Sequence, residues 1–420
     1  MKSYKTYISL FFIVNAFVFP FLYYSDTFNL YSSENRNNAN GVKTLSNVSF
    51  YSFRTIYNPT SDEKKLLKKI KPNELTFRLF DVDIDAKRKT PVPVSPLRIN
   101  KNTSDFLRNM KDTEISGLVF ITNRTLLNSS DNDISTLATN IFAKTESLLK
   151  EAGIVIRDLQ IDCDWNNSTR EKYFTLLKSI QEKLNTKSIS LSVTIRLHQI
   201  KFREITGVPP ADRGILMFYN MDDPGKWETK NSILDINTAK KYVERLNEYP
   251  LPLDVALPLY SQTVIFSAGR ITGIISGDLI QELSNKSCYE VIAENRYRAK
   301  RRCLLQNSFG SSQDISRGSL LRYETSERQE VIESLRLLLN RRKNIRKFYI
   351  YDYNQALFVT NRANVIDPTM PAKQKSKKRN STYETDDKFQ TRFNEKNIKT
   401  LSALSEIFLT YSSLSNPSVR

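Results

Sequence analysis

The sequence predicts an α/β fold, a single (β/α)8 TIM-like barrel with a long cap insertion after strand seven and a C-terminal tail. From residue 49 onward, short β-rich runs alternate with segments of helical period, which is the pattern of a parallel sheet wrapped by helices. The β-rich runs number eight, at which a closed sheet fills its own interior. The rival, an open doubly wound sheet, would carry a glycine-rich phosphate loop, and the sequence has none.

The eight strands are predicted from runs of apolar, β-branched and aromatic residues bounded by turn residues. They cover residues 50–57, 75–82, 117–122, 159–164, 189–198, 215–220, 253–260 and 348–353. Between them, segments such as 173–184, 239–246 and 331–339 carry apolar residues three and four positions apart. This spacing predicts amphipathic helices that pack on the sheet.

The two ends of the chain differ from the barrel in composition. Lys2 and Lys5 precede an uncharged run over 8–24, which is the layout of an export signal. Residues 1–26 are therefore expected to be a signal peptide or an N-terminal membrane anchor, followed by a linker over 27–47. The protein is expected to be exported, and to be periplasmic, membrane-anchored or secreted.

The barrel itself is assigned to residues 48–365. Within it, the connection over 261–327 is too long for a simple loop and predicts a cap over the barrel mouth. Residues 366–420 are expected to form a basic linker and a weakly helical tail, a marginal appendage to the barrel.

Cysteine, histidine and charge limit the chemistry. Of three cysteines, Cys288 and Cys303 could pair in an oxidising compartment, whereas Cys163 has the setting of a small buried apolar residue. The single histidine, His198, excludes a multi-histidine metal site, and neither a metal nor a cofactor is expected.

The net charge of +18 would attract an anionic envelope surface. Nucleic acid is disfavoured as a partner by the export segment and by the lack of a recognisable binding module.

The candidate site follows from the fold, since active sites of such barrels lie at the C-terminal ends of the strands. Alternation along the fourth strand turns Gln160, Asp162 and Asp164 toward the lumen. Two carboxylates about 7 Å apart on one strand face would raise each other's proton affinity. Asp162 and Asp164 are therefore candidates for acid/base catalysis.

The fifth strand places Arg196 and His198 on the inner face by the same alternation. Arg196 could pair with Asp162 or Asp164, or bind an anionic substrate group. A lone histidine can also be purely structural. Arg78 on the second strand is another inward arginine, for which packing against an aspartate inside the barrel is the structural alternative.

Further candidates lie where the last three strands end. They are the substrate-binding candidates Tyr219, Asn220, Asp222, Tyr260 and Asp352. Aromatic rings at a barrel mouth can stack on the apolar faces of sugars. Tyrosine is common in strands in general, so the aromatic signal is weak by itself.

Several of these segments resemble an uncharacterised bacterial family, domain-of-unknown-function family 3142. The resemblance is carried by LQIDCDW at 159–165, SVTIRLHQ at 192–199 and DRGILMFYNM at 212–221, with RLFDVD at 78–83 and LLRYE at 320–324. It spans about residues 48–360. It implies a glycosidase-like barrel with no established activity.

Residues 161–166 are also similar, more distantly, to the strand-four motif of chitinase-type glycosidases. In that motif alternating aspartates lead through a tryptophan to a catalytic glutamate, and here Asn166 stands at the glutamate position. Asn220 likewise replaces the aspartate of the strand-six motif. Because an amide cannot donate a proton to a leaving oxygen, either Asp164 or Glu324 from the cap acts as the acid, or the barrel only binds glycan.

These observations favour carbohydrate as the partner and give two functional hypotheses. In the first, a glycoside hydrolase-like enzyme uses Asp162 and Asp164 as acid and base, Arg196 and His198 orient them, and tyrosines line the sugar site. In the second, a non-catalytic barrel binds a glycan or the cell envelope.

Overall fold

The computed structural model describes residues 47–307, 311–342, 344–360, 391–393 and 395–415. The expected signal peptide or anchor, and most of the expected basic linker after residue 365, lie outside these residues. Within the described ranges, no helix is long and apolar enough to cross a membrane.

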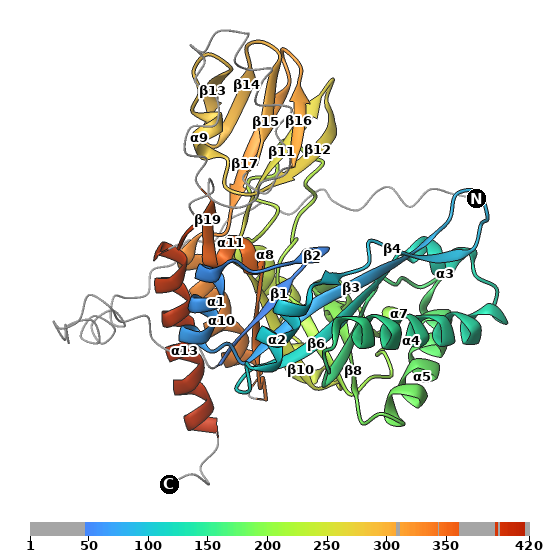
Figure 1. Ribbon diagram of the computed structural model, residues 1–420. Helices are drawn as coiled ribbons and strands as arrows, with labels where there is room; N and C mark the ends of the chain where they lie inside the picture. Colours follow the sequence, from blue (N-terminus) through green and yellow to red (C-terminus); the bar gives the residue numbers. More distant parts are fainter. Residues whose placement is uncertain (1–46, 308–310, 343, 361–390, 394, 416–420) are drawn as a thin grey trace, which may run out of the picture. The chain divides into compact units, whose positions relative to one another are not determined.

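Eight parallel strands close into a barrel, which confirms the predicted fold class (Figure 1). Seven neighbouring pairs run in the order β1, β18, β10, β9, β8, β7, β6, β3, and pairing of β1 with β3 closes the ring. The barrel strands are β1 (Val48–Ser52), β3 (Glu74–Ile84), β6 (Glu114–Ile121), β7 (Asp158–Asp162), β8 (Ser190–Arg196), β9 (Arg213–Met217), β10 (Leu253–Pro258) and β18 (Phe348–Tyr351). Each overlaps one predicted strand. The antiparallel strand β4 (Pro91–Val94) adds to the edge of β3 beyond the ring.

Helices follow most of the barrel strands. They are α1 (Ser61–Ile70), α2 (Lys101–Arg108), α3 (Asn123–Asn128), α4 (Asp133–Ala152), α5 (Arg170–Asn185), α6 (Leu197–Lys201), α7 (Arg203–Thr206), α8 (Ile236–Tyr242), η1 (Leu246–Glu248), α10 (Arg328–Arg341) and α11 (Tyr353–Leu357). The helix α1 begins with a capping box, in which Thr60 accepts from the backbone of Glu63 and the Glu63 side chain accepts from the backbone of Thr60. The short parallel pair β2 (Ile56–Tyr57) and β5 (Arg98–Ile99) lies outside the ring.

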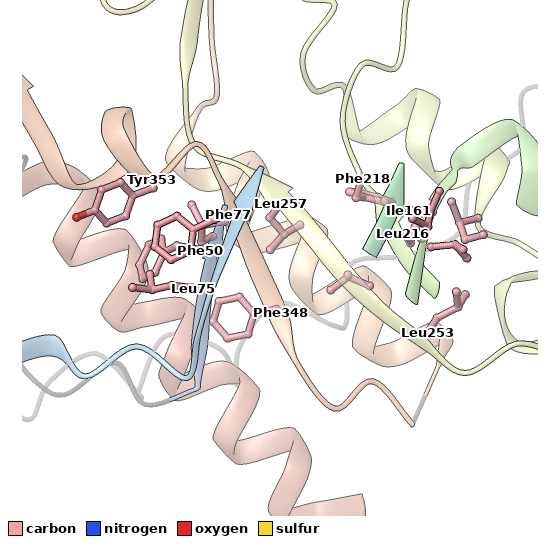
Figure 2. Packing of buried hydrophobic residues seen from close by; sticks show 14 of the residues in the cluster. Phe50, Leu75, Phe77, Ile161, Leu216, Phe218, Leu253, Leu257, Phe348 and Tyr353 are labelled. Atoms are coloured by element: carbon pink, nitrogen blue, oxygen red, sulfur yellow. The ribbon is translucent and has the colours of Figure 1, made fainter. Parts of the chain in front are cut away.

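Alternation along the strands separates two cores. Outward residues such as Phe50, Leu75, Phe77 and Phe348 are buried in the large apolar cluster that also includes the helices (Figure 2). Inward residues form a second, smaller cluster in the lumen, which contains Tyr51, Leu118, Ile215, Met217, Tyr219, Ala256 and Tyr349. The predicted inward direction of Gln160 is confirmed, because its Oε1 accepts a 2.9 Å hydrogen bond from the Tyr51 hydroxyl.

The N-terminal end of the lumen holds a buried charge network, which we call the base network. It consists of Glu74, Asp158, Arg213, Asp254 and Tyr349. Arg213 contacts Asp254 at 2.7 Å and Asp158 at 3.2 Å, and it donates to the Tyr349 hydroxyl at 3.0 Å. Burial raises the pKa of Asp158 to about 6, although Arg213 acts in the opposite direction. The base of the lumen is thus stabilised by compensation of charge rather than by apolar packing.

The connection after β10 is an insertion, as predicted from its length, and the structure shows that it is rich in β-strands. Its five-stranded antiparallel sheet has the order β12, β11, β17, β14, β13, and a separate hairpin pairs β15 with β16. The elements are β11 (Ser261–Ser267), β12 (Arg270–Ser276), α9 (Ile280–Leu283), β13 (Tyr289–Ala293), β14 (Arg296–Ala299), β15 (Cys303–Gln306), β16 (Ser312–Ile315) and β17 (Leu320–Thr325). An apolar cluster of its own includes Ile265, Leu305 and Leu321.

A disulfide joins Cys288 and Cys303 in this insertion, while Cys163 is a buried free thiol. The bond closes a loop of 15 residues, which by chain entropy stabilises by about 3 kcal/mol. We therefore expect reduction of the bond, or a Cys288→Ser/Cys303→Ser double variant, to speed amide hydrogen exchange in β13 and β14 while barrel amides keep their rates. A Cys163→Ala variant is the matched control and should respond to reductant as the wild type does. Equal exchange with and without the bond would contradict this prediction.

The C-terminal tail contains α13 (Glu395–Ser415), beside the antiparallel pair β19 (Phe358–Thr360) and β20 (Thr391–Phe393). Leu401, Leu404 and Phe408 of this helix are buried in the main apolar cluster, and the Phe408 ring lies 5.2 Å from that of Phe348 on β18. The expectation of a marginal appendage is therefore corrected, because the helix is part of the barrel core. The sequence pattern was weak since its apolar stripe is narrow.

Candidate functional site

Asp162 is the last residue of β7 and points into the lumen at the C-terminal end of the barrel. Its Oδ1 accepts a 2.6 Å hydrogen bond from Thr194 on the neighbouring strand β8. Burial raises the pKa of Asp162, and this effect exceeds the opposing influence of Arg196 and the Thr194 hydrogen bond. Asp162 is thereby a carboxyl group with an increased affinity for a proton.

Asp164 lies two residues beyond the end of β7 and is in a different environment. Its Oδ1 receives a 2.6 Å hydrogen bond from Nε of Arg196, whose Nη2 lies 3.7 Å from Oδ1 of Asp162. The side chain of Asp164 is 55% exposed, against 12% for Asp162. The two carboxylates thus share one guanidinium, but one is buried and the other faces solvent, which is the asymmetry that acid/base catalysis requires.

Asp162 and Arg196 border a cavity of about 470 Å³, which we call the mouth cavity. It is lined by Phe53, Asp162, Arg196, Tyr219, Asn220, Asp222, Pro224, Ser232, Tyr260, Gln262, Ile274, Ser276 and Tyr351. Five of the predicted site residues are thus brought together with Asp162. The lining combines aromatic rings with a few polar groups, which is the usual composition of a small-ligand site.

Three tyrosines and Phe53 form the aromatic part of the mouth cavity. The rings of Tyr219 and Tyr351 are stacked with centroids 5.2 Å apart, and Tyr260 meets both edge-on. The Tyr260 hydroxyl donates to Oδ1 of Asn220 at 3.0 Å, and Asn220 has a left-handed backbone with φ of 56°. Such a backbone is costly for a non-glycine residue, and asparagine tolerates it better than most. The strained position fixes Asn220 at the wall of the cavity.

The structure corrects the expected placement of His198. The strand β8 ends at Arg196, and His198 lies in the helix α6, where its side chain is exposed. Strand alternation therefore does not extend to it. His198 lines a second cavity of about 410 Å³, together with Asp164, Arg196, Tyr219 and Asn220. Burial lowers the pKa of His198, so the neutral imidazole is favoured there.

Glu324, the candidate acid from the cap, does not line either cavity at the mouth. It is fully buried on β17, where its Oε1 receives a 2.7 Å hydrogen bond from Nε of Arg322. Its other oxygen accepts from Ser232 and Gln262, which do line the mouth cavity. Glu324 therefore does not face the mouth cavity itself, but it contacts two side chains that do.

Arg78 is also kept away from both cavities. A register shift in β3 between Arg78 and Phe80 turns Arg78 and Asp81 to the same face, where they form an ion pair. This is the structural alternative considered for Arg78 from the sequence.

Asp352 does not line the mouth cavity. It lies just before α11, and its Oδ1 accepts a 2.6 Å hydrogen bond from the backbone of Asn354. Burial raises the pKa of Asp352 to about 6, against the opposing backbone hydrogen bonds and Arg54. The structure therefore places Asp352 at the start of a helix and not among the residues that line the mouth cavity, where the sequence had suggested a substrate-binding role.

This raised pKa gives a testable dependence of stability on pH. A carboxyl group with a raised folded pKa contributes stability at low pH, and that stability is lost between the usual value of 3.8 and about 6. We expect Asp352→Asn to raise the melting temperature by about 1–3 °C at pH 7.5 and to have little effect at pH 4. Thermal scans of both proteins at the two pH values check this. Asp131→Asn, at an exposed position, is the control, and an effect of Asp352→Asn that is independent of pH would contradict the prediction.

Seven residues that line the mouth cavity were not predicted as site residues, namely Phe53, Pro224, Tyr351, Ser232, Gln262, Ile274 and Ser276. Ser232, Gln262, Ile274 and Ser276 come from the loop after β9 and from the insertion, where no strand-end rule applies. The sequence indicated these four residues only indirectly, through the expectation that the insertion caps the barrel mouth.

In the described part of the chain, no three histidine, cysteine, aspartate or glutamate residues are grouped so that they could hold a metal ion.

The fold and the site define a (β/α)8 barrel with a carboxylate, arginine and tyrosine cavity at its C-terminal end. No model of a known protein family matches the chain, and no curated protein matches it.

Among solved structures, the chain is similar to a chitinase from Chromobacterium violaceum, with 12% identity, a TM-score of 0.45, and coverage of 73% of this chain and 94% of that one. It is similar to the Bacillus cereus spore cortex-lytic enzyme SleL, with 14% identity, a TM-score of 0.44, and coverage of 73% and 71%. A GH18 chitinase from Cycas revoluta, in complex with (GlcNAc)4, gives 14% identity, a TM-score of 0.45, and coverage of 73% and 95%. With TM-scores below 0.5, these likenesses do not say what this chain binds or does.

Proposed function

We propose that the chain is a glycoside hydrolase-like barrel that binds a glycan in the mouth cavity and cleaves it by carboxylate acid/base chemistry. The observation that carries the proposal is the pair of unequal carboxylates around Arg196. Asp162 lies at the wall of the mouth cavity, which three tyrosines line, and Asp164 lines the second cavity, which shares Arg196, Tyr219 and Asn220 with the first. Tyrosine rings and a few fixed polar groups suit a sugar, which has apolar faces and hydroxyl edges. The resemblance of residues 48–360 to family 3142 belongs to this proposal as well.

In the proposed reaction, protonated Asp162 donates its proton to the glycosidic oxygen as the bond to the anomeric carbon breaks. A water molecule attacks the anomeric carbon, and Asp164 accepts the proton that this water loses. The Thr194 hydroxyl and Arg196 hold the two carboxyl groups in place. His198 lies beside Asp164 and is available to contact the water or the leaving sugar.

A non-catalytic glycan- or envelope-binding barrel is the second candidate. It is favoured by the 2.6 Å contact that occupies Asp164 and by Asn166, whose Oδ1 is engaged in a local turn with Ser168. The amides at positions 166 and 220 stand where acidic residues would support catalysis in the similar chitinase motifs.

The two candidates are separated by testing the wild type and Asp164→Asn on a panel of chitotetraose and peptidoglycan fragments. Calorimetry measures binding, and release of reducing ends measures turnover. Turnover by the wild type that is lost in Asp164→Asn with binding retained supports the enzyme. Binding by the wild type without turnover supports the second candidate, and neither binding nor turnover contradicts both.

We further propose that the chain is exported, with residues 1–26 acting as a signal peptide or a membrane anchor. The disulfide between Cys288 and Cys303 supports this location, because such bonds persist in oxidising compartments. The net charge of +18 adds a possible second contact, with an anionic envelope surface. Mass spectrometry of the N-terminus of protein recovered outside the cytoplasm would distinguish a cleaved signal from a retained anchor.

A further inference from the structure

Behind the mouth cavity, Arg322 and Glu324 form a fully buried ion pair on β17. Arg322 donates from Nε to Glu324 at 2.7 Å, and its remaining donors bind the backbone carbonyls of Pro224, Lys226 and Trp227. These contacts engage at most four of the five guanidinium N–H groups, and the charge of Arg322 balances that of Glu324. A carboxylate in this position can only accept hydrogen bonds.

The second oxygen of Glu324 accepts hydrogen bonds from two side chains that line the mouth cavity. Its Oε2 accepts from the Ser232 hydroxyl at 2.6 Å and from Nε2 of Gln262 at 2.7 Å. Nε2 of Gln262 also donates to the Ser232 oxygen at 3.2 Å. Because the two acceptors are only 2.6 Å apart, one N–H of the Gln262 amide points between them and is shared by both. The amide cannot be reversed, because its oxygen would then face the carboxylate.

The orientation of the amide leaves one group of Gln262 for a ligand. Its Oε1 has no partner among the described residues, and it is not one of the polar atoms that are sealed from solvent. Gln262 lines the mouth cavity, so this oxygen is the part of the residue that a bound molecule meets.

We propose that Gln262 is a specificity-determining residue, whose Oε1 accepts a hydrogen bond from a hydroxyl or amide N–H of the ligand. Glu324 is the positioning residue that fixes this polarity, with Arg322 as its counter-ion. The inference rests on the proposed function in that the ligand is a glycan, whose hydroxyl and acetamido groups are the required donors. A sugar with an acceptor-only group at this point would leave Oε1 unpaired and bind more weakly.

The locked amide is tested without any ligand. In protein labelled with nitrogen-15 at glutamine side chains, the signal missing from Gln262→Met identifies the Gln262 amide. We expect its hydrogen-bonded proton to exchange slowly with water in the wild type and at least tenfold faster in an Arg322→Met/Glu324→Gln double variant. The double variant is used because loss of either partner alone would leave a buried unpaired charge. Fast exchange in the wild type would overturn the proposed locking.

The ligand contact is tested by calorimetry with chitotetraose and a peptidoglycan fragment. Gln262→Met has a similar shape but no acceptor oxygen, and we expect it to weaken binding about three- to tenfold. Gln329→Met makes the same substitution at an exposed position of α10 that lines neither cavity, so it is the matched control and should bind as the wild type does. Unchanged affinity in Gln262→Met would overturn the contact. A wild type that binds neither probe would contradict the proposed function and the ligand contact, whereas slow amide exchange would still support the locked orientation.

Discussion

Asp162→Asn is expected to lower kcat on a cleavable glycan by about 10²- to 10⁴-fold while substrate binding changes little. An amide has nearly the shape of the carboxyl group, but it has no proton to give to the glycosidic oxygen. Because burial raises the pKa of Asp162, the wild type should keep its active acid up to a higher pH than an exposed aspartate would. The rate should fall as the pH rises through this pKa, and that fall should be missing from the residual activity of Asp162→Asn.

Thr194→Val is the matched variant for this prediction. It removes the 2.6 Å hydrogen bond that lowers the pKa of Asp162 and leaves the carboxyl group in place. The alkaline limb of the pH–rate profile should therefore move to higher pH, with activity retained. If Asp162→Asn turned over substrate as fast as the wild type, Asp162 would not be the acid.

The second large effect is expected at the opposite end of the barrel. Arg213→Met should lower the free energy of unfolding by about 3–5 kcal/mol, because it leaves the buried carboxylates of Asp158 and Asp254 without their closest cation, whereas Glu74 keeps its 2.8 Å contact with Lys347. Arg213 contacts Asp158 and Asp254 directly and lies 4.0 Å from Glu74. Denaturant unfolding at pH 7.5 measures the loss.

The control for this variant is Arg157→Met. Arg157 precedes β7, is exposed, and lines the same hollow at the barrel base as Arg213. Its replacement should change stability by less than 1 kcal/mol, as surface substitutions usually do. Lowering the pH toward 4 should reduce the deficit of Arg213→Met, since protonated Asp158 no longer needs a counter-charge. Equal stability of the two variants would show that the base network does not stabilise the barrel.

The barrel was predictable from the sequence because each strand carries its own apolar run. Local alternation also placed Gln160 and Asp162 in the lumen, since both lie within β7. The alternation of side chains no longer predicted their direction beyond the ends of the strands. His198 was assigned to a strand that had already turned into α6, and Asp164 lies beyond the last ladder pair of β7.

Contacts between distant segments account for the remaining differences at the site. Glu324 is buried by Arg322 and by a loop about a hundred residues earlier in the chain, which no local pattern records. Gln262 was overlooked for the same reason, because its role depends on a partner on another strand. The weak helical signal of α13 became a core contact only through Phe348.

Closure of the barrel joins the first of its strands to the last. Val48 pairs in register with Phe348, and α13 seals this seam from outside. A nascent chain therefore cannot complete the ring until β18, the last of the eight strands along the chain, has left the ribosome. During synthesis the other seven strands can pair only as an open sheet, and the lumen is enclosed in a late step.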